Sequence, residues 1–213
     1  MTAATRADGE AAAGQVITAL AGWPAPRSGV LVVAIDGHGT AGKSTIAARI
    51  ADATGAALVH TDDFFQGLPA APATGQPTPR RPMRQYYDWR RIRAQALEPL
   101  RARRQVAFRR FDWRRGAGLD GLVTVAPADL ILLEGVFSAA PELSDLVDRS
   151  VFVDTPEQER LRRLRAQVTP DDWDADWLVA QQSYFRLTRP AASFDLIVPG
   201  LDPGSAGPSG GTP

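Results

Sequence analysis

The 213-residue chain contains no cysteine, two histidines and very little lysine. The absence of cysteine excludes disulfides, thiolate catalysis and cysteine metal sites, and it fits a reducing compartment. Two histidines without further ligands do not make a metal site. No stretch approaches the roughly 20 apolar residues that span a bilayer, and the N-terminus lacks the apolar core of a secretory signal. We therefore expect a cytoplasmic protein without a membrane partner.

The chain also lacks net charge, because 24 basic residues balance 24 acidic ones. A neutral molecule is not drawn as a whole to nucleic acid or to anionic lipid. Thirteen arginines lie between residues 80 and 115, interleaved with aromatic residues. This cluster leaves a nucleic-acid-associated ATPase or switch as an alternative, which low-salt binding to oligonucleotides would reveal. We favour a solvated helix face and hairpin, with nucleic acid not a partner.

Short apolar runs alternate with helical segments along the chain. The expected strands are 29–35, 56–60, 129–135, 150–155 and 194–199, and the expected helices are 9–23, 44–54 and 88–104, the last weakened by Pro99. Buried strands that alternate with helices predict an α/β fold with three layers, α/β/α, around a mostly parallel five-stranded sheet. Ligands of such sheets bind at the carboxyl ends of the strands.

The remaining segments give the domain boundaries. We expect an N-terminal tail (1–7) and helix within residues 1–28, one domain over 29–200, and a disordered Gly/Pro/Ser-rich tail over 201–213. Within the domain, two short runs predict a β-hairpin insertion at about 105–126, and an arginine-rich stretch predicts a helical lid at about 160–190.

The stretch AIDGHGTAGKST (34–45) contains the only lysine of the chain, Lys43, among 23 arginines. It fits G-x-x-x-x-G-K-[ST] between an expected strand and an expected helix, the context of a phosphate-binding loop in a P-loop NTPase fold. The glycines let successive N–H groups converge on phosphate, and the helix N-terminus adds positive charge. A lysine ammonium fits this cradle, whereas the planar fork of arginine is too wide.

The loop residues predicted to bind the nucleotide are Gly37, His38, Gly39, Thr40, Ala41, Gly42, Lys43, Ser44 and Thr45. Lys43 is also predicted to act in catalysis, and the Ser44 hydroxyl to hold Mg²⁺.

Two other strand ends carry acids. Asp62, in HTDDFF (60–65), could orient an acceptor hydroxyl as the catalytic base, or it could be a loop acid or helix cap. Glu134 ends a buried run and could reach Mg²⁺, or it could hydrogen-bond a neighbouring loop. We expect ATP and Mg²⁺ as cofactors, with Ser44 and Glu134 as the metal ligands.

With these pieces in order, residues 30–200 resemble the uridine kinase family of P-loop kinases. DGHGTAGKST is similar to its phosphate loop, ILLEG to its third strand and FDLIVPG to its last strand. DDFF (62–65) is similar to the segment whose first acid is the family's base, which falls on Asp62. YYDWRRI (86–92) resembles the segment that holds the ribose hydroxyls, which implies a substrate role for Asp88.

The resemblance extends to the hairpin and the lid. FRRFDW (108–113) is similar to the base-binding hairpin, which implies substrate contacts for Phe111 and Asp112. VDTPEQERLRRLR (153–165) is similar to the entry into the lid, where Arg163 would approach the substrate and Arg165 the ATP phosphates.

The chain departs from the family where the pyrimidine is read. Phe111 replaces a tyrosine hydroxyl, the hairpin has no histidine, and residues 166–177 contain no second lid arginine. A pocket without such donors loses selectivity. We therefore expect a kinase that phosphorylates a small-molecule acceptor, and a nucleoside such as uridine or cytidine is the acceptor that we favour. The alternative is a non-nucleoside metabolite such as a sugar, a vitamin precursor or an antibiotic. A homo-oligomer is left open.

Overall fold

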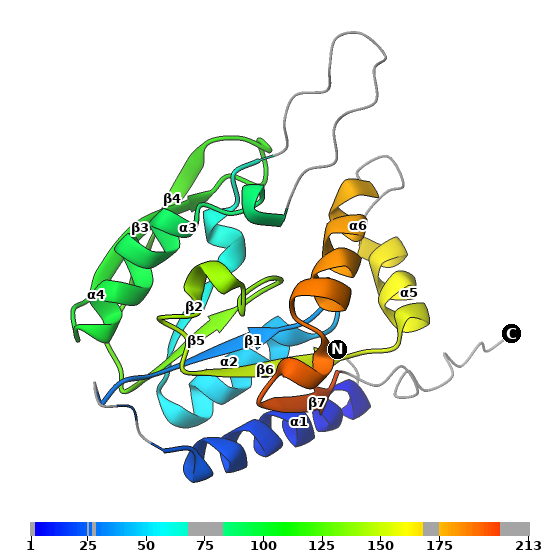
Figure 1. Ribbon diagram of the computed structural model, residues 1–213, viewed down its shortest axis with the longest axis horizontal. Helices are drawn as coiled ribbons and strands as arrows, with labels where there is room; N and C mark the ends of the chain where they lie inside the picture. Colours follow the sequence, from blue (N-terminus) through cyan, green and yellow to red (C-terminus); the bar gives the residue numbers. More distant parts are fainter. Residues whose placement is uncertain (1–2, 25, 27–28, 68–82, 168–174, 201–213) are drawn as a thin grey trace, which may run out of the picture.

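The computed structural model describes residues 3–24, 26, 29–67, 83–167 and 175–200 (Figure 1). The predicted C-terminal tail, 201–213, lies outside the described residues, as does the middle of the predicted lid, 168–174.

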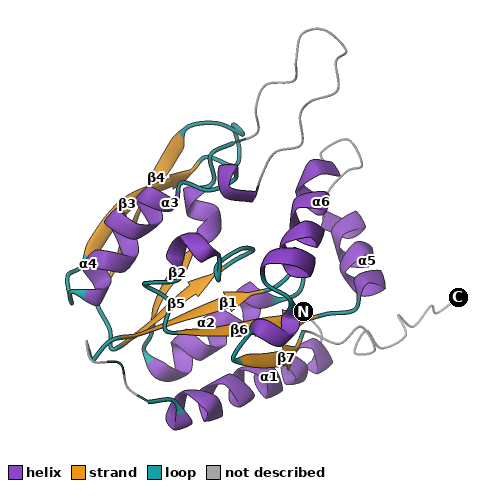
Figure 2. Ribbon diagram, in the orientation of Figure 1, coloured by secondary structure: helices purple, strands orange, loops and turns teal. Residues whose placement is uncertain are grey.

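Five parallel strands form the central sheet in the order β2-β5-β1-β6-β7 (Figure 2). In chain order they are β1 (Leu31–Asp36), β2 (Ala57–His60), β5 (Leu130–Glu134), β6 (Arg149–Asp154) and β7 (Leu196–Pro199). The apolar runs become strands because both sheet faces are covered, so consecutive side chains are buried: every residue of β1 after Leu31 is inaccessible.

The two faces of the sheet carry separate hydrophobic cores. Val33 and Ile35 of β1 pack with α1 (Ala3–Gly22) and α2 (Lys43–Thr54). Val32 and Ala34 point to the opposite core, as the two-residue period of a strand requires. The helical run over residues 89–101 and the end of α6 (Ala175–Ser183) cover that second face (Figure 1). The predicted three-layer α/β/α fold is therefore confirmed.

Two helices differ from expectation. Helix α1 begins at Ala3, so the prediction of a loose tail over 1–7 is wrong from that residue on; the alanines of this stretch have the highest helix propensity. The helix expected over 88–104 runs as α3 (Trp89–Arg91), a π-helical stretch η3 (Ile92–Leu97) and α4 (Glu98–Arg101). Pro99 has no N–H to donate to the preceding turn, and the helix widens before it.

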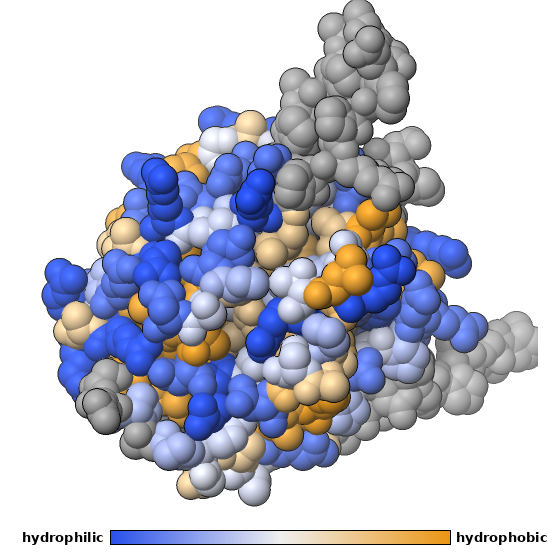
Figure 3. Space-filling view, in the orientation of Figure 1, coloured by the Kyte–Doolittle hydropathy of each residue, from blue (hydrophilic) through white to orange (hydrophobic). Residues whose placement is uncertain are grey.

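Strands β3 (Val106–Phe111) and β4 (Leu119–Val125) form a small antiparallel hairpin, with a bulge between Arg109 and Arg110. Further along, α5 (Glu157–Gln167) follows β6, and α6 continues into a π-helical turn η6 (Tyr184–Thr188). Hydrophilic residues predominate on the face shown in Figure 3, with hydrophobic ones interspersed.

Three strand ends meet at the carboxyl edge of the sheet. Glu134 of β5 lies opposite Ile35 on one side and opposite His60 on the other. The segments that follow β1, β2 and β5 therefore emerge next to one another, which places the predicted phosphate loop beside Asp62 and Glu134.

Candidate functional site

The predicted phosphate loop connects β1 to α2 in one tight bend. Gly37 has φ 147°, and a Cβ there would lie 2.6 Å from the carbonyl oxygen of Val153. Gly42 has φ 97° and is the N-cap of α2, without a side-chain partner. Thr40 is in the left-handed region at φ 61°. The predicted loop residues thus form one cradle at a helix N-terminus, which is the geometry of an anion site.

Lys43 is the first residue of α2 and is only 6% exposed. Its Nζ donates to the carbonyl oxygen of His38, 2.9 Å away, so the ammonium lies over the loop. Its charge is one of the causes that lower the pKa of Glu134, and it opposes in part the burial and the Glu134 charge that raise the pKa of Asp62. A buried ammonium beside two acids and a loop of amides is placed to neutralise phosphate oxygens.

Ser44 and Glu134, the predicted metal ligands, are adjacent: the serine hydroxyl donates to Glu134 Oε1 at 3.0 Å. The other oxygen, Oε2, is 2.7 Å from Nδ1 of His60. Burial alone would raise the pKa of Glu134, but the hydrogen bond with His60 and the Lys43 charge outweigh it and lower the pKa. The carboxylate is therefore ionised at neutral pH.

A hydroxyl and an ionised carboxylate in contact fit Mg²⁺, which takes one or two protein oxygens and completes its shell with phosphate and water. Among the described residues, no group of three or more His, Asp or Glu could hold a metal by itself. The donor set therefore fits a metal that arrives with a phosphate ligand. His60 was not predicted as a site residue, although the sequence places it two residues before Asp62.

Asp62 lies in a short 3₁₀ turn, η1 (Thr61–Phe64), directly after β2. Its Oδ1 accepts a hydrogen bond of 2.8 Å from the hydroxyl of Tyr87. The side chain reaches solvent, yet the surrounding protein and then the Glu134 charge raise its pKa. A carboxylate with a raised pKa, fixed by a buried tyrosine, is suited to accept a hydroxyl proton. Tyr87 is a second residue that motif reasoning missed.

Asp36 was missed as well, although it is a charged residue at the end of an apolar run. It is fully buried and accepts four hydrogen bonds of 2.8–3.0 Å. The donors are the amides of Gly37, Phe137 and Ala139 and the hydroxyl of Tyr184. Asp36 thereby ties the phosphate loop to the segment after Glu134 and to the end of α6. Phe137 has φ 66°, so this carboxylate also holds a strained turn.

Three of the predicted substrate residues, Asp88, Phe111 and Asp112, lie in the segment after Tyr87 and in the hairpin. Asp88 caps α3, its Oδ1 accepting from the amide of Arg91 at 3.0 Å, and it follows Tyr87 directly. Phe111 is 4% exposed within the hairpin. Asp112 is 7% exposed and accepts the amides of Arg114 and Arg115. Each of the two carboxylates has a local structural partner, and their substrate roles stay predictions.

Aromatic rings pack against one another between the hairpin, the segment after β2 and α6. Trp113, which is 56% exposed, stacks on Phe65 with ring centroids 4.8 Å apart. Trp177 of α6 lies edge-on to Tyr86 at 4.8 Å. Phe111 meets Phe65 at 5.2 Å. The hairpin, the segment after β2 and α6 therefore converge in one aromatic cluster beside Asp62.

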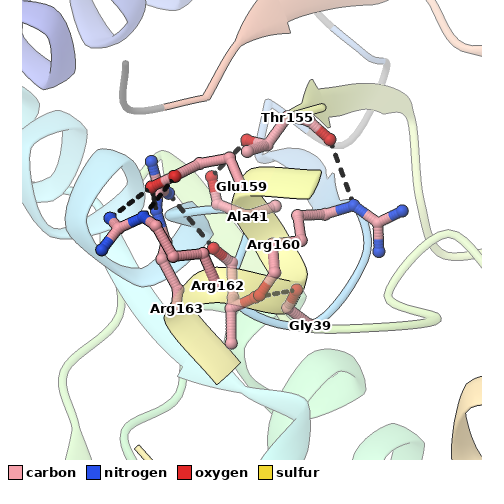
Figure 4. A network of polar contacts seen from close by, with 8 residues as sticks. Gly39, Ala41, Thr155, Glu159, Arg160, Arg162 and Arg163 are labelled. Atoms are coloured by element: carbon pink, nitrogen blue, oxygen red, sulfur yellow. Dashed lines mark hydrogen bonds and ion pairs between the residues drawn. The ribbon is translucent and has the colours of Figure 1, made fainter. Parts of the chain in front are cut away.

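Helix α5 lies against the phosphate loop through polar contacts (Figure 4). Thr40 Oγ1 is 2.9 Å from the carbonyl oxygen of Arg160, and Arg163 Nη1 donates to the carbonyl of Thr40 at 3.2 Å. Glu159 is buried and accepts from both Arg162 and Arg163, which lower its pKa to about 2.

Of the two predicted lid arginines, Arg163 is thus held beside the loop, and Arg165 is exposed near the end of α5. Their roles toward substrate and ATP stay predictions.

Comparisons with known proteins were made on this fold and site. No family model matches the chain. The uridine kinase of Halobacterium salinarum is 27% identical over 162 residues, which cover 74% of this chain and 71% of that protein. The uridine kinase of Lactobacillus helveticus is 27% identical over 187 residues, covering 79% of this chain and 86% of that one.

Two solved structures share the fold. A possible uridine kinase from Bacillus stearothermophilus superposes with a TM-score of 0.65 at 20% identity, over 89% of this chain and 98% of that one. A putative fructose transport system kinase from Silicibacter has a TM-score of 0.62 at 22% identity, over 88% and 98%. The chain is thus a distant sequence relative of the uridine kinases and shares its fold with these two structures. Among the described residues no helix is both long and apolar enough to cross a membrane.

Proposed function

Because the chain is a distant relative of the uridine kinases, we propose that it transfers the γ-phosphoryl group of ATP to a hydroxyl of a small molecule. The observation that carries the proposal is the convergence of Lys43, the Ser44–Glu134 pair and Asp62 at one edge of the sheet. Such transfer needs positioning and charge neutralisation more than covalent chemistry, and these residues provide both.

ATP would supply the phosphoryl group, and Mg²⁺ would neutralise charge on its oxygens. Lys43 and the amides at the start of α2 would hold the phosphates, and Ser44 with Glu134 would hold the metal. Asp62, fixed by Tyr87, would orient the acceptor hydroxyl and take its proton as the bond to phosphorus forms. Arg165 would reach the ATP phosphates and Arg163 the substrate, as the resemblance implies.

We favour a nucleoside such as uridine or cytidine as the acceptor. The relatives at 27% identity are uridine kinases, and the aromatic cluster around Phe65 and Trp113 offers ring faces on which a base could stack. Asp88 would then hold the ribose hydroxyls.

A non-nucleoside acceptor is the second candidate, and a specific observation favours it. Phe111 is buried among rings and has no hydroxyl, so the hairpin offers no tyrosine donor to a pyrimidine edge at this position. A protein with the same fold carries the description of a putative fructose transport system kinase, so we include sugars among the acceptors to test. The cysteine-free composition is consistent with our proposal that the reaction takes place in the cytoplasm.

The proposal is tested by ADP release with a panel of acceptors: uridine, cytidine, adenosine, D-fructose and D-ribose. Asp62→Asn should lower kcat by roughly 10²–10⁴-fold, the range for loss of a general base, and should leave the affinity for ATP unchanged. Asp63→Asn is the matched control, because it removes the neighbouring carboxylate. Turnover of Asp62→Asn at the wild-type rate would refute the base role. Turnover of fructose or ribose but not of uridine or cytidine would select the second candidate.

A further inference from the structure

The end of α6 and the π-helical turn η6 that continues it meet the phosphate loop through one face. Gln181 Oε1 accepts a hydrogen bond of 2.7 Å from the amide of Gly39. One turn further on, Tyr184 donates to Asp36 at 2.9 Å, and the ring of Phe185 lies 4.4 Å from that of His38. Positions 181, 184 and 185 have the i, i+3, i+4 spacing of a single helix face.

The amide group of Gln181 is fixed in place. The residue is 2% exposed, and its neighbours on the same face, Tyr184 and Phe185, are 1% and 8% exposed. A Cβ at Gly39 would lie 3.4 Å from Gln181 Oε1, in van der Waals contact, so the glutamine lies directly against this loop position. Because the side chain of Gln181 is buried and has a fixed position, its hydrogen bond with the Gly39 amide restrains the loop.

Within the phosphate loop, two amides donate to side chains, and the amide of Ala41 donates to the carbonyl oxygen of His38 at 3.2 Å. The amide of Gly37 is bound by Asp36, and that of Gly39 by Gln181. Beyond them, the N-cap of α2 is Gly42, which has no side-chain oxygen to offer to the first amides of the helix, and these amides have no acceptor within the helix. Side chains therefore accept hydrogen bonds from the amides that bend the loop, and the amides at the start of α2 can donate to a ligand.

We propose that Gln181 is a positioning residue for nucleotide binding, which deepens the proposed function and rests on it. By holding the amide of Gly39, Gln181 fixes the curvature of the loop, so that Lys43 and the amides of α2 face one phosphate group. It acts through the loop, and the phosphate contacts belong to Lys43 and α2.

The first test uses the nucleotide-free protein and needs no activity. Hydrogen exchange of the Gly39 amide, followed by NMR, should accelerate roughly tenfold or more in Gln181→Ala, because the amide loses its acceptor. Gln182→Ala is the matched control, since Gln182 is the exposed neighbour on the same helix. Gln181→Glu keeps an oxygen at the same reach and should retain the protection. Unchanged exchange in Gln181→Ala would overturn the proposal.

The second test is calorimetry with a nonhydrolysable ATP analogue and Mg²⁺. Gln181→Ala should weaken binding roughly tenfold, the effect of one buried hydrogen bond, and Gln182→Ala should bind like the wild type. Equal or tighter binding in Gln181→Ala would overturn the proposal, since a glutamine that competes with phosphate gives that result. If the wild-type protein does not bind the analogue, the proposed function fails, while the exchange experiment still decides whether Gln181 holds the loop.

Discussion

Replacing Asp36 by asparagine should alter the pH dependence of stability. Burial raises the pKa of Asp36 to about 6 from its ordinary 3.8, against the opposing effect of its hydrogen bonds. The folded chain therefore binds this proton more tightly than the unfolded chain does. The stability that results is fully present below the unfolded value of 3.8 and is lost as the pH rises through about 6. Two pKa units correspond to about 3 kcal/mol.

Asparagine carries no charge and removes that dependence, but it also changes the hydrogen bonds. Its Oδ1 could still accept from Gly37 and Phe137, whereas its Nδ2 would face the amide of Ala139. One buried donor left without an acceptor costs about 1–3 kcal/mol. At about pH 7.5 the substitution also stabilises the protein, because it removes the buried charge of Asp36, and the cost of the unpaired donor nearly offsets this gain. The two proteins should therefore be similarly stable at that pH. At about pH 4.5 Asp36→Asn should be less stable by about 2 kcal/mol.

Urea unfolding at both pH values, followed by tryptophan fluorescence, measures this difference. Every other titrating group is common to the two proteins, so its contribution cancels in the comparison. Tyr184→Phe is the internal control: it removes a hydrogen bond that lowers the pKa of Asp36, so it should steepen the pH dependence. A difference between wild type and Asp36→Asn that is the same at both pH values would refute the reasoning.

Two further predictions concern Lys43 and helix α5. Lys43→Met should reduce kcat roughly 10²–10³-fold, as for removal of one preorganised charge at a transition state. Steady-state kinetics with ATP measure this loss, and Arg49→Met is the control on the same helix. Unchanged kinetics of Lys43→Met would contradict the proposed role of the phosphate loop. Glu159→Gln should destabilise the protein at neutral pH because it removes the ion pairs with Arg162 and Arg163. The loss should be only about 1 kcal/mol, since these arginines are partly exposed to solvent. The pKa of Glu159 is lowered to about 2, so its contribution to the free energy of unfolding is present above pH 4.5 and is lost as the pH falls toward 2. In urea unfolding, Glu159→Gln should therefore have a smaller effect at low pH than at neutral pH, and the control Glu157→Gln should have no effect. An effect of Glu159→Gln that does not change with pH would argue against the ion pair.

The strands and the phosphate loop could be predicted because their causes are local. Strand β1 is an apolar run buried on both sides, and the loop needs glycines, one ammonium and a helix start in fixed order. The acids at the ends of β2 and β5 were also found, since parallel strands bring their carboxyl ends to one edge.

The contacts that orient the site could not be predicted because they join distant segments. Tyr87 reaches Asp62 from 25 positions away, and Gln181 reaches Gly39 from 142 positions away. No local pattern marks a tyrosine or a glutamine for such a partner. Asp36 had a local signal, a charge at the end of a buried strand, but its four donors come from three segments that only the fold assembles.

The solitary lysine has a practical consequence for chemistry on this protein. Apart from the chain terminus, acylating or reductive-alkylation reagents find one primary amine, and it lies 6% exposed inside the cradle. Loss of labelling at Lys43, located by mass spectrometry, would therefore report that a ligand occupies the loop, whichever acceptor the protein uses.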